Sequence, residues 1–121
     1  MILDSNILIG YLNGDANIIS SLQEWRESGA VLFISPVSAI EALSLASLSP
    51  DDVAVTENFL DDFIIVPIDT QIVRTAGALR RAYRLNVPDA TIVATAVTNN
   101  LPLVTRDKKM RAVPNIVLAE I

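Results

Sequence analysis

Short apolar runs alternate with longer segments of helical periodicity along the whole of this chain. The alternation is typical of an α/β fold, because each helix returns the chain so that the next strand can run parallel to the previous one. We expect strands at residues 1–3, 31–34, 64–68, 101–104 and 116–118. We expect helices at residues 5–12, 16–28, 36–47, 51–62, 70–85 and 89–99. The sequence therefore predicts an α/β protein with a central parallel sheet of about five short strands.

Three of these helices have clear start signals. Ser35 is placed to cap a helix whose first residue, Pro36, needs no hydrogen-bonded N–H. The stretch "SPDD" at 49–52 repeats that pattern and adds two acids to the first turn, where the helix dipole favours them. Asp69 can cap the long amphipathic segment that follows it.

The length and composition indicate one domain over residues 1–121. The chain has no internal repeat, low-complexity segment or linker. Apolar residues make up 51% of it, yet the longest apolar runs are far too short to span a bilayer. No basic segment precedes an apolar one at the start, as a secretory signal would require. We therefore expect no membrane segment and a cytoplasmic location.

The sequence contains neither histidine nor cysteine. Catalytic triads of the Ser-His-Asp and Cys-His kinds are therefore excluded, as are imidazole acid–base pairs and the usual zinc sites. If the protein is an enzyme, carboxylates, hydroxyls, basic side chains or hard metal ions must carry the chemistry.

Charge is divided unevenly along the chain, whose net charge is −5. Residues 1–73 hold eleven acids and one base, a net charge of −10, whereas residues 74–121 hold eight bases and three acids, a net charge of +5. The second half can attract a polyanion that the whole chain would weakly repel.

Four acids stand near predicted strand or helix ends, and each has a purely structural interpretation. Asp4 can cap the helix after it, and Asp89 stands at a helix start. Glu41 fits a capping box with Ser38, and Asp107 can be a turn residue paired with basic neighbours.

Topology favours a shared site for these four acids. In a parallel sheet with returning helices, strand carboxyl ends and helix amino ends meet at one edge, where ligands bind. Asp4 and Asp107 follow strands, and Asp89 begins a helix. Glu41 lies about one turn inside its helix, and its longer side chain leans back toward that edge. Converging carboxylates repel each other, and oxygen ligands select Mg²⁺ or Mn²⁺, so we expect one or two such ions and a metal-activated water.

Four motifs together resemble the PIN domain family, and within it the VapC-type toxins of toxin–antitoxin pairs. They are "LDSNILI" at 3–9, "SAIEAL" at 38–43, "VPDATIVATA" at 87–96 and "LPLVTRDKKM" at 101–110. The resemblance implies a three-layer α/β/α fold and a Mg²⁺- or Mn²⁺-dependent endoribonuclease that hydrolyses RNA. It also implies the toxin role in a type II pair, with a cognate antitoxin as partner. The apolar-rich composition fits a homodimer.

The family's functional residues carry over position by position. Asp4, Glu41, Asp89 and Asp107 match its acidic quartet, as catalytic residues and metal ligands. Some members place the last acid about three residues further on, where this chain has Met110, so only Asp107 is available. The residues expected to orient the carboxylates or the bound water are Ser5, Asn6 and Thr105.

Two groups of basic residues are candidates for RNA contact. They are Arg80, Arg81 and Arg84 in the helix at 70–85, with Arg74 two turns earlier, and Arg106, Lys108, Lys109 and Arg111 after the fourth strand. Both can grip phosphates, and both can instead form a solvated face with ion pairs. We favour RNA contact for the second group, because topology places it beside the acids.

Two other classes of protein share this length and layout. A receiver domain is one, but no lysine follows the final strand here, and a haloacid-dehalogenase phosphatase would need a second acid where Asn6 stands. The main alternative is a catalytically idle PIN scaffold that acts as a protein- or RNA-binding module. The complete acidic quartet argues against an idle scaffold.

Overall fold

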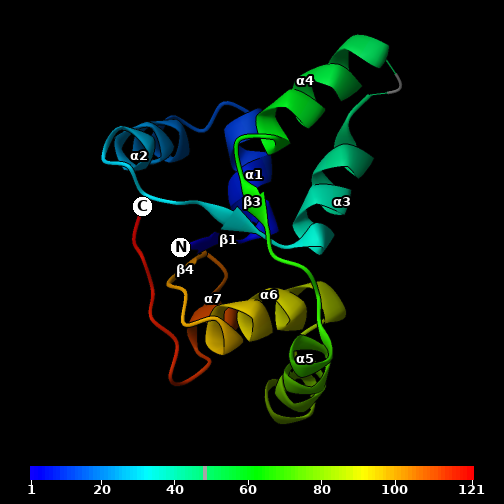
Figure 1. Cartoon of the computed structure of the whole chain (residues 1–121), viewed down its shortest axis with the longest axis vertical. Coiled ribbons are helices and arrows are strands. Elements are labelled where there is room, and N and C mark those ends of the chain that lie inside the picture. Colours follow the sequence, from blue (N-terminus) through cyan, green and yellow to red (C-terminus); the bar gives the residue numbers. More distant parts are fainter. Residues whose placement is uncertain (48) are drawn as a thin grey trace.

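Four short parallel strands form the sheet in the computed structural model, which describes residues 1–47 and 49–121 (Figure 1). They are β1 (Ile2–Leu3), β2 (Phe33–Ile34), β3 (Ile64–Ile65) and β4 (Leu103–Val104). The spatial order is β3-β2-β1-β4, and every pairing is parallel. Both β1 and β2 are therefore interior strands, and the parallel sheet predicted from the sequence is confirmed.

The prediction of a fifth strand at residues 116–118 is wrong. Residues 116–118 meet the sheet only through a single bridge between Leu118 and Leu103. In a parallel ladder alternate residues of a strand face the same neighbour, so Thr105 would be the next residue of this strand to pair with the segment. The Thr105 carbonyl oxygen accepts a hydrogen bond from Arg111 Nη1 at 2.9 Å, and within the described residues the ladder has no second bridge.

Seven helices occur in the described residues. They are α1 (Ser5–Leu12), α2 (Ala16–Glu27), α3 (Pro36–Leu45), α4 (Pro50–Leu60), α5 (Thr70–Tyr83), α6 (Val87–Thr98) and α7 (Lys108–Arg111). Six were predicted, each with both ends within two residues. The seventh was missed, because four residues are too few to show a helical period. None of the helices described is both long and apolar enough to cross a membrane.

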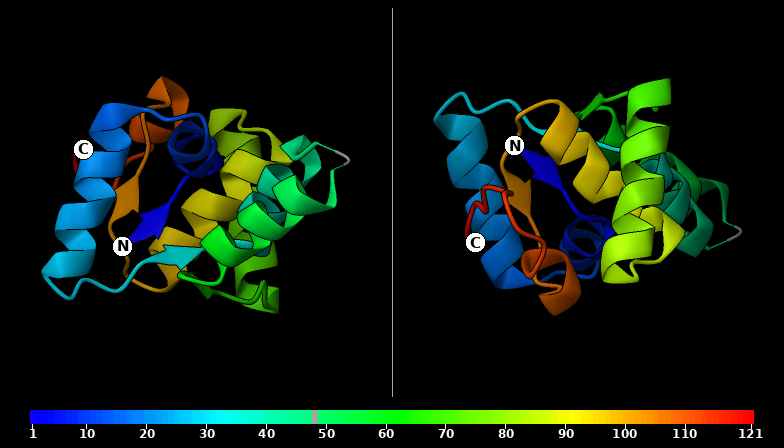
Figure 2. Two further views of the ribbon diagram at one scale, coloured as in Figure 1. Left: turned by 90° about the horizontal axis from the view of Figure 1, so that it is seen from above. Right: turned by 90° about the horizontal axis from the view of Figure 1, so that it is seen from below.

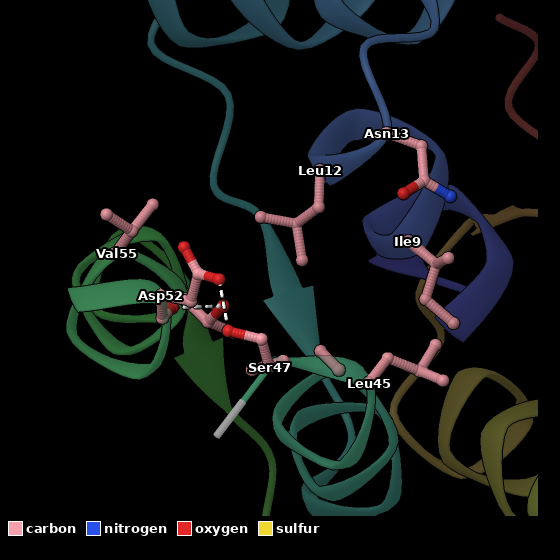
Figure 3. Close-up of a pocket in the computed structure, with 10 residues that line it drawn as sticks. Ile9, Leu12, Asn13, Leu45, Ser47, Asp52 and Val55 are labelled. Carbon is pink, nitrogen blue, oxygen red and sulfur yellow. Dashed lines mark hydrogen bonds between the residues drawn. The ribbon is translucent and has the colours of Figure 1, made fainter. Parts of the chain in front are cut away.

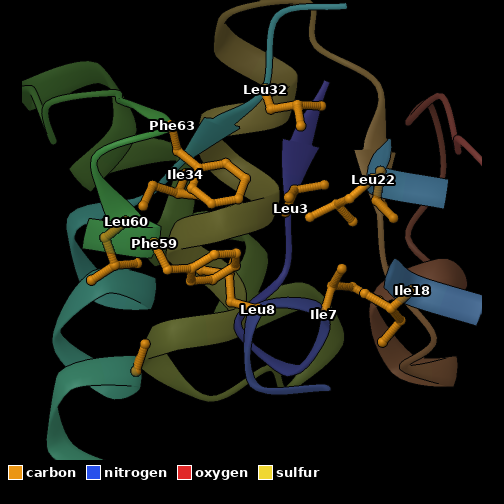
Figure 4. Close-up of a cluster of buried hydrophobic side chains, with 12 residues drawn as sticks. Leu3, Ile7, Leu8, Ile18, Leu22, Leu32, Ile34, Phe59, Leu60 and Phe63 are labelled. Atoms are coloured by element: carbon orange, nitrogen blue, oxygen red, sulfur yellow. The ribbon is translucent and has the colours of Figure 1, made fainter. Parts of the chain in front are cut away.

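The helices cover both faces of the sheet and make the expected three-layer arrangement. Helices α1 to α4 pack on one face and α5 to α7 on the other (Figure 1), and Figure 2 looks through these layers from above and from below. Successive strand residues supply the two cores, as the period of two requires. In β1, Ile2 faces α6 and Leu3 faces α1, and in β4 Leu103 and Val104 divide in the same way. Figure 4 shows the larger of these two cores.

Side-chain caps fix where several helices begin. Ser35 Oγ accepts from Val37 N at 3.2 Å, and Asp69 Oδ1 accepts from Ile72 N at 2.8 Å, as expected. Ser49 precedes α4, but its hydroxyl makes no capping hydrogen bond. Helix α6 begins two residues before its predicted start, because Asn86 rather than a later residue caps it.

Leu22→Ala should destabilise the protein by about 2–5 kcal/mol, because this fully buried side chain would leave a cavity in the larger core. Leu45→Ala removes the same atoms from a side chain that is 66% exposed, and should change stability by less than about 0.5 kcal/mol. Urea unfolding of both variants measures the difference. Equal losses would mean that the core is not packed around Leu22.

Candidate functional site

Asp4 and Thr105 meet at the carboxyl edge of the sheet. Asp4 follows β1, Thr105 follows β4, and the two strands are neighbours. Thr105 Oγ1 donates to Asp4 Oδ2 at 2.8 Å, and both residues are only 2% exposed. Asp4 occupies the N-cap position of α1, but its side chain makes no capping hydrogen bond. Its carboxylate is thus directed to the sheet edge rather than to the helix.

Asp107 is tied to the same edge. Its backbone N–H donates to Thr105 Oγ1 at 3.0 Å, and its Oδ1 accepts from Met110 N at 3.0 Å. The interpretation of Asp107 as a turn residue paired with basic neighbours is therefore incomplete, because it caps α7. One carboxylate oxygen of Asp107 serves the helix, and Thr105 joins it to Asp4.

Glu41 reaches the edge from α3, where Ser5 meets it. Ser5 is the first residue of α1, and its Oγ lies 2.8 Å from Glu41 Oε1. The predicted capping box of Glu41 with Ser38 is wrong, because α3 begins earlier and Ser35 caps it. Ser38 Oγ lies 2.9 Å from Ser5 Oγ instead.

Burial dominates the electrostatics of Asp4. It raises the pKa of Asp4 to about 6, and the hydrogen bond from Thr105 opposes the rise. The negative charges of Asp89 and Asp107 raise this pKa further. Asp89 and Asp107, from distant parts of the sequence, are therefore close enough to Asp4 to raise its pKa.

Asp89, in the first turn of α6, belongs to the same cluster. Its pKa is raised by partial burial, then by the charges of Asp107 and Glu41. The Asn86 hydrogen bond and the positive charge of Lys109 act in the opposite direction. All four predicted acids are thus linked by mutual repulsion, although they come from four separate segments.

The donor set fits a hard divalent cation. The candidate ligands are all oxygen atoms, and the neighbouring negative charges that raise the pKa of Asp4 and of Asp89 favour a cation at this edge. Within residues 1–47 and 49–121, no three acidic side chains are already grouped as a metal site. Mg²⁺ does not need such a group, since it keeps several waters and commonly takes one or two carboxylates. Asp4, Glu41 and Asp89 are the residues that would hold it.

The basic residues after β4 differ in what they contact. Arg106 Nη1 pairs with Asp15 Oδ2 at 2.8 Å on the surface. Arg111 donates to the Thr105 carbonyl and to Glu120 Oε1, the latter at 2.5 Å. Lys108 and Lys109 are exposed on α7. The two lysines are therefore the side chains of this group most available to a phosphate.

The basic residues of α5 lie near its end. Arg80 Nε donates to the Leu85 carbonyl at 3.1 Å and so closes the turn after the helix. Arg84 has the left-handed backbone conformation, with φ of 56°. Arg81 and Arg84 are exposed. In this group, Arg80 has a structural role and the other two remain open to solvent.

Sequence reasoning named Ser38 and Arg111 but missed their contacts at the predicted site, and it placed Asn6 there although no contact is found among the described residues. Ser38 was considered only as a cap, although its spacing of three from Glu41 puts both on one helix face. Arg111 reaches Thr105 from α7, which was not predicted. Asn6 is exposed, and its side chain makes no hydrogen bond within the described part of the chain.

A groove of mixed polar and apolar lining lies between α1, α3 and α4 (Figure 3). Its volume is about 430 Å³. Ile9, Leu12, Leu45 and Val55 face it from the three helices. The Ser47 hydroxyl donates to Asp52 at its rim. The groove shares α1 and α3 with the Ser5–Glu41 pair.

This fold belongs to a known family. The PIN domain family matches residues 1–116, and the chain is a member of that family. The membership rules out the receiver and phosphatase alternatives.

Solved structures agree over nearly the full length. A chain of a toxin–antitoxin complex from Klebsiella pneumoniae is 31% identical, with 99% of this chain and 98% of that chain covered and a TM-score of 0.83. VapBC2 from Rickettsia felis, solved with a DNA fragment from its promoter, is 20% identical at a TM-score of 0.84, with 99% and 97% covered. DNA-bound VapBC from Salmonella typhimurium is 22% identical at a TM-score of 0.81, with 98% and 96% covered. A search of curated proteins finds no match.

The raised pKa of Asp4 makes stability depend on pH. An acid whose pKa is higher in the folded protein than in the unfolded chain stabilises the fold when protonated, and that contribution is lost as the pH rises from about 4 to about 6. Asp4→Asn keeps the shape without the charge, so it should be more stable than the wild type at pH 7 by about 1–3 kcal/mol. The difference should vanish near pH 4.

Urea unfolding at several pH values in EDTA measures this effect. Asp61→Asn, at the exposed end of α4, should keep the pH dependence of the wild type. If Asp4→Asn were less stable than the wild type at pH 7, the assigned burial of the charge would be incorrect.

Proposed function

We propose that this protein is a metal-dependent endoribonuclease that uses Asp4, Glu41, Asp89 and Asp107 as its catalytic acids. The observation that carries the proposal is a pair of short contacts at the carboxyl edge of the sheet: Thr105 Oγ1 donates to the buried Asp4 Oδ2 at 2.8 Å, and Ser5 Oγ lies 2.8 Å from Glu41 Oε1. The fold alone does not require an acid at this buried position, because burying a carboxylate costs free energy unless something compensates its charge. Membership of the PIN domain family supports the same assignment.

A bound Mg²⁺ or Mn²⁺ would activate water for attack on an RNA phosphodiester and offset the charge that develops on the leaving oxygen. Hydrogen bonds within the chain position the carboxylates for such a cation. Thr105 holds one oxygen of Asp4 and leaves the other for the cation. Ser5 does the same for Glu41. Asp107 caps α7 with one carboxylate oxygen, so only its other oxygen is available to a cation.

The protein is further proposed to be the toxin of a type II toxin–antitoxin pair, of the VapC type. The likeness to a chain of the Klebsiella pneumoniae complex supports this, at 31% identity over almost the entire length. A cognate antitoxin is then the expected protein partner. The groove between α1, α3 and α4, which shares α1 and α3 with the Ser5–Glu41 pair, offers apolar side chains such as Ile9 and Leu12 to such a partner.

A homodimer is also proposed. Its support is a set of apolar side chains that are at least 40% exposed, three of which, Ile68, Val73 and Val87, line one hollow between α5 and α6. They are Ile64, Ile65, Ile68, Val73 and Val87, from β3 and the segments around α5 and α6. Exposed apolar surface of this kind commonly marks an interface between proteins.

The second candidate function is an idle PIN scaffold that binds RNA or protein without cleavage. What favours it is the lack of three acids already grouped around a common point in the described residues. Metal binding separates the two functions, because an idle scaffold has no use for a cation at Asp4.

Asp4→Asn and Asp89→Asn should each lower Mn²⁺-dependent RNA cleavage by at least about 100-fold, because each removes a direct ligand. The wild type should lose its activity in EDTA and regain it with Mg²⁺ or Mn²⁺. RNA cleavage by purified protein measures the rates, with the exposed Asp51→Asn as the matched control.

Calorimetric Mn²⁺ titration of the same proteins provides the second reading. Asp4→Asn should bind more weakly than the wild type and than Asp51→Asn. Equal binding by the wild type and Asp4→Asn would favour the idle scaffold, and cleavage that persists in both site variants would point to a contaminating nuclease.

Lys108→Ala/Lys109→Ala should raise the KM for RNA several-fold and flatten its dependence on salt, because two phosphate contacts would be lost. The kcat should stay near that of the wild type. Arg74→Ala/Arg81→Ala removes the same charge from exposed positions on α5 and should change KM less. Steady-state cleavage at several salt concentrations measures both, and an equal rise in the two double variants would contradict the preference for α7.

A further inference from the structure

Three oxygen atoms form an unbroken chain from the core to the acidic edge. Ser38 Oγ lies 2.9 Å from Ser5 Oγ, and Ser5 Oγ lies 2.8 Å from Glu41 Oε1. Ser38 is fully buried and Ser5 is 5% exposed, so water does not compete freely for either hydroxyl. Ser38 and Glu41 stand one turn apart on α3, and Ser5 comes from α1.

The direction of the two hydrogen bonds follows from the number of protons. A serine hydroxyl donates one hydrogen bond. The ionised form of Glu41, which is the form that a cation would bind, accepts hydrogen bonds and donates none. The Ser5 proton must therefore go to Glu41, and Ser38 must supply the proton between the two serines.

We infer that Ser38 is a positioning residue for Glu41: its buried hydroxyl donates to Ser5 Oγ and thereby directs the Ser5 proton onto the Glu41 carboxylate. Without the Ser38 hydroxyl, Ser5 Oγ keeps its proton but loses the partner that selects its rotamer. The Ser5 hydroxyl can then turn away from Glu41, and the carboxylate is free to occupy other rotamers. The consequence for catalysis rests on the proposed function, whereas the effect on Glu41 does not.

Ser38→Ala tests the inference, and Ser44→Ala is its matched control. Alanine is favoured within a helix, and the substitution only removes an oxygen atom. Ser44 lies on the same helix but is exposed, and its hydroxyl bonds to the Ile40 carbonyl at 2.6 Å. The control therefore removes a hydroxyl from α3 without touching the chain of oxygens.

The first measurement needs neither metal nor RNA. Three-bond NMR couplings in the metal-free protein report whether the Glu41 side chain holds one rotamer. We expect a single rotamer in the wild type and in Ser44→Ala, and rotamer averaging in Ser38→Ala. Averaging in the wild type would overturn the inference without any variant, and so would a single rotamer in Ser38→Ala.

The second measurement follows the effect to the metal. Mn²⁺ should bind Ser38→Ala about 10–100-fold more weakly than the wild type, as is usual when a residue that orients a ligand is lost. The kcat for RNA should fall over the same range with little change in KM, a split that a general loss of stability would not produce. Binding and kcat equal to those of the wild type would overturn the inference.

The two proposals can fail separately. If the wild type neither binds Mn²⁺ nor cleaves RNA, the proposed function is incorrect, while the rotamer measurement still decides the role of Ser38. If the wild type does both and Glu41 stays ordered in Ser38→Ala, only the role of Ser38 is rejected.

Discussion

The Thr105 hydroxyl donates to Asp4 Oδ2 across the carboxyl end of the sheet, and the rest of the acidic site is arranged around that hydrogen bond. It joins residues 101 positions apart, at the ends of β1 and β4. It also compensates part of the burial that raises the pKa of Asp4. The same hydroxyl receives the backbone N–H of Asp107, and Arg111 holds the Thr105 carbonyl. Thr105 therefore connects the end of β4 to the end of β1 and to helix α7, and it contacts both Asp4 and Asp107.

Two consecutive residues, Asp4 and Ser5, connect the acidic site to two different elements. Asp4 turns toward β4, where Thr105 meets it, and Ser5 turns toward α3, where it meets Glu41. The change from strand to helix between these residues makes this possible, because a strand residue and a helix residue in succession point in different directions. The short stretch after β1 thus connects both layers of the site. The Thr105 hydroxyl holds one oxygen of Asp4 and the Ser5 hydroxyl holds one oxygen of Glu41, which leaves the other oxygen of each carboxylate for a ligand.

Most of the fold could be predicted from the sequence because it depends on local patterns. Apolar periodicity and caps such as Ser35 and Asp69 act within a few residues, and six helices were found with both ends within two residues. The failures were non-local or very short. The strand at 116–118 depended on whether its pairing with β4 continued beyond Leu103, and only one bridge forms in the described residues. Helix α7 has only four residues, so it has no period to detect.

The candidate site divides along the same line. The sequence alone predicted that Asp4, Glu41, Asp89 and Asp107 form one site, because residue type, order and spacing relative to strands and helices are written in it. The absence of histidine and cysteine also limited the chemistry, because it left no imidazole or thiolate to serve as base, nucleophile or ligand. Only the tertiary structure decided which hydroxyl holds which carboxylate. Ser38 had to be distinguished from a helix cap, and Arg106 from a free cation, by partners 33 and 91 positions away. Such pairings depend on how β1, α3 and β4 pack together, and no local pattern encodes that packing.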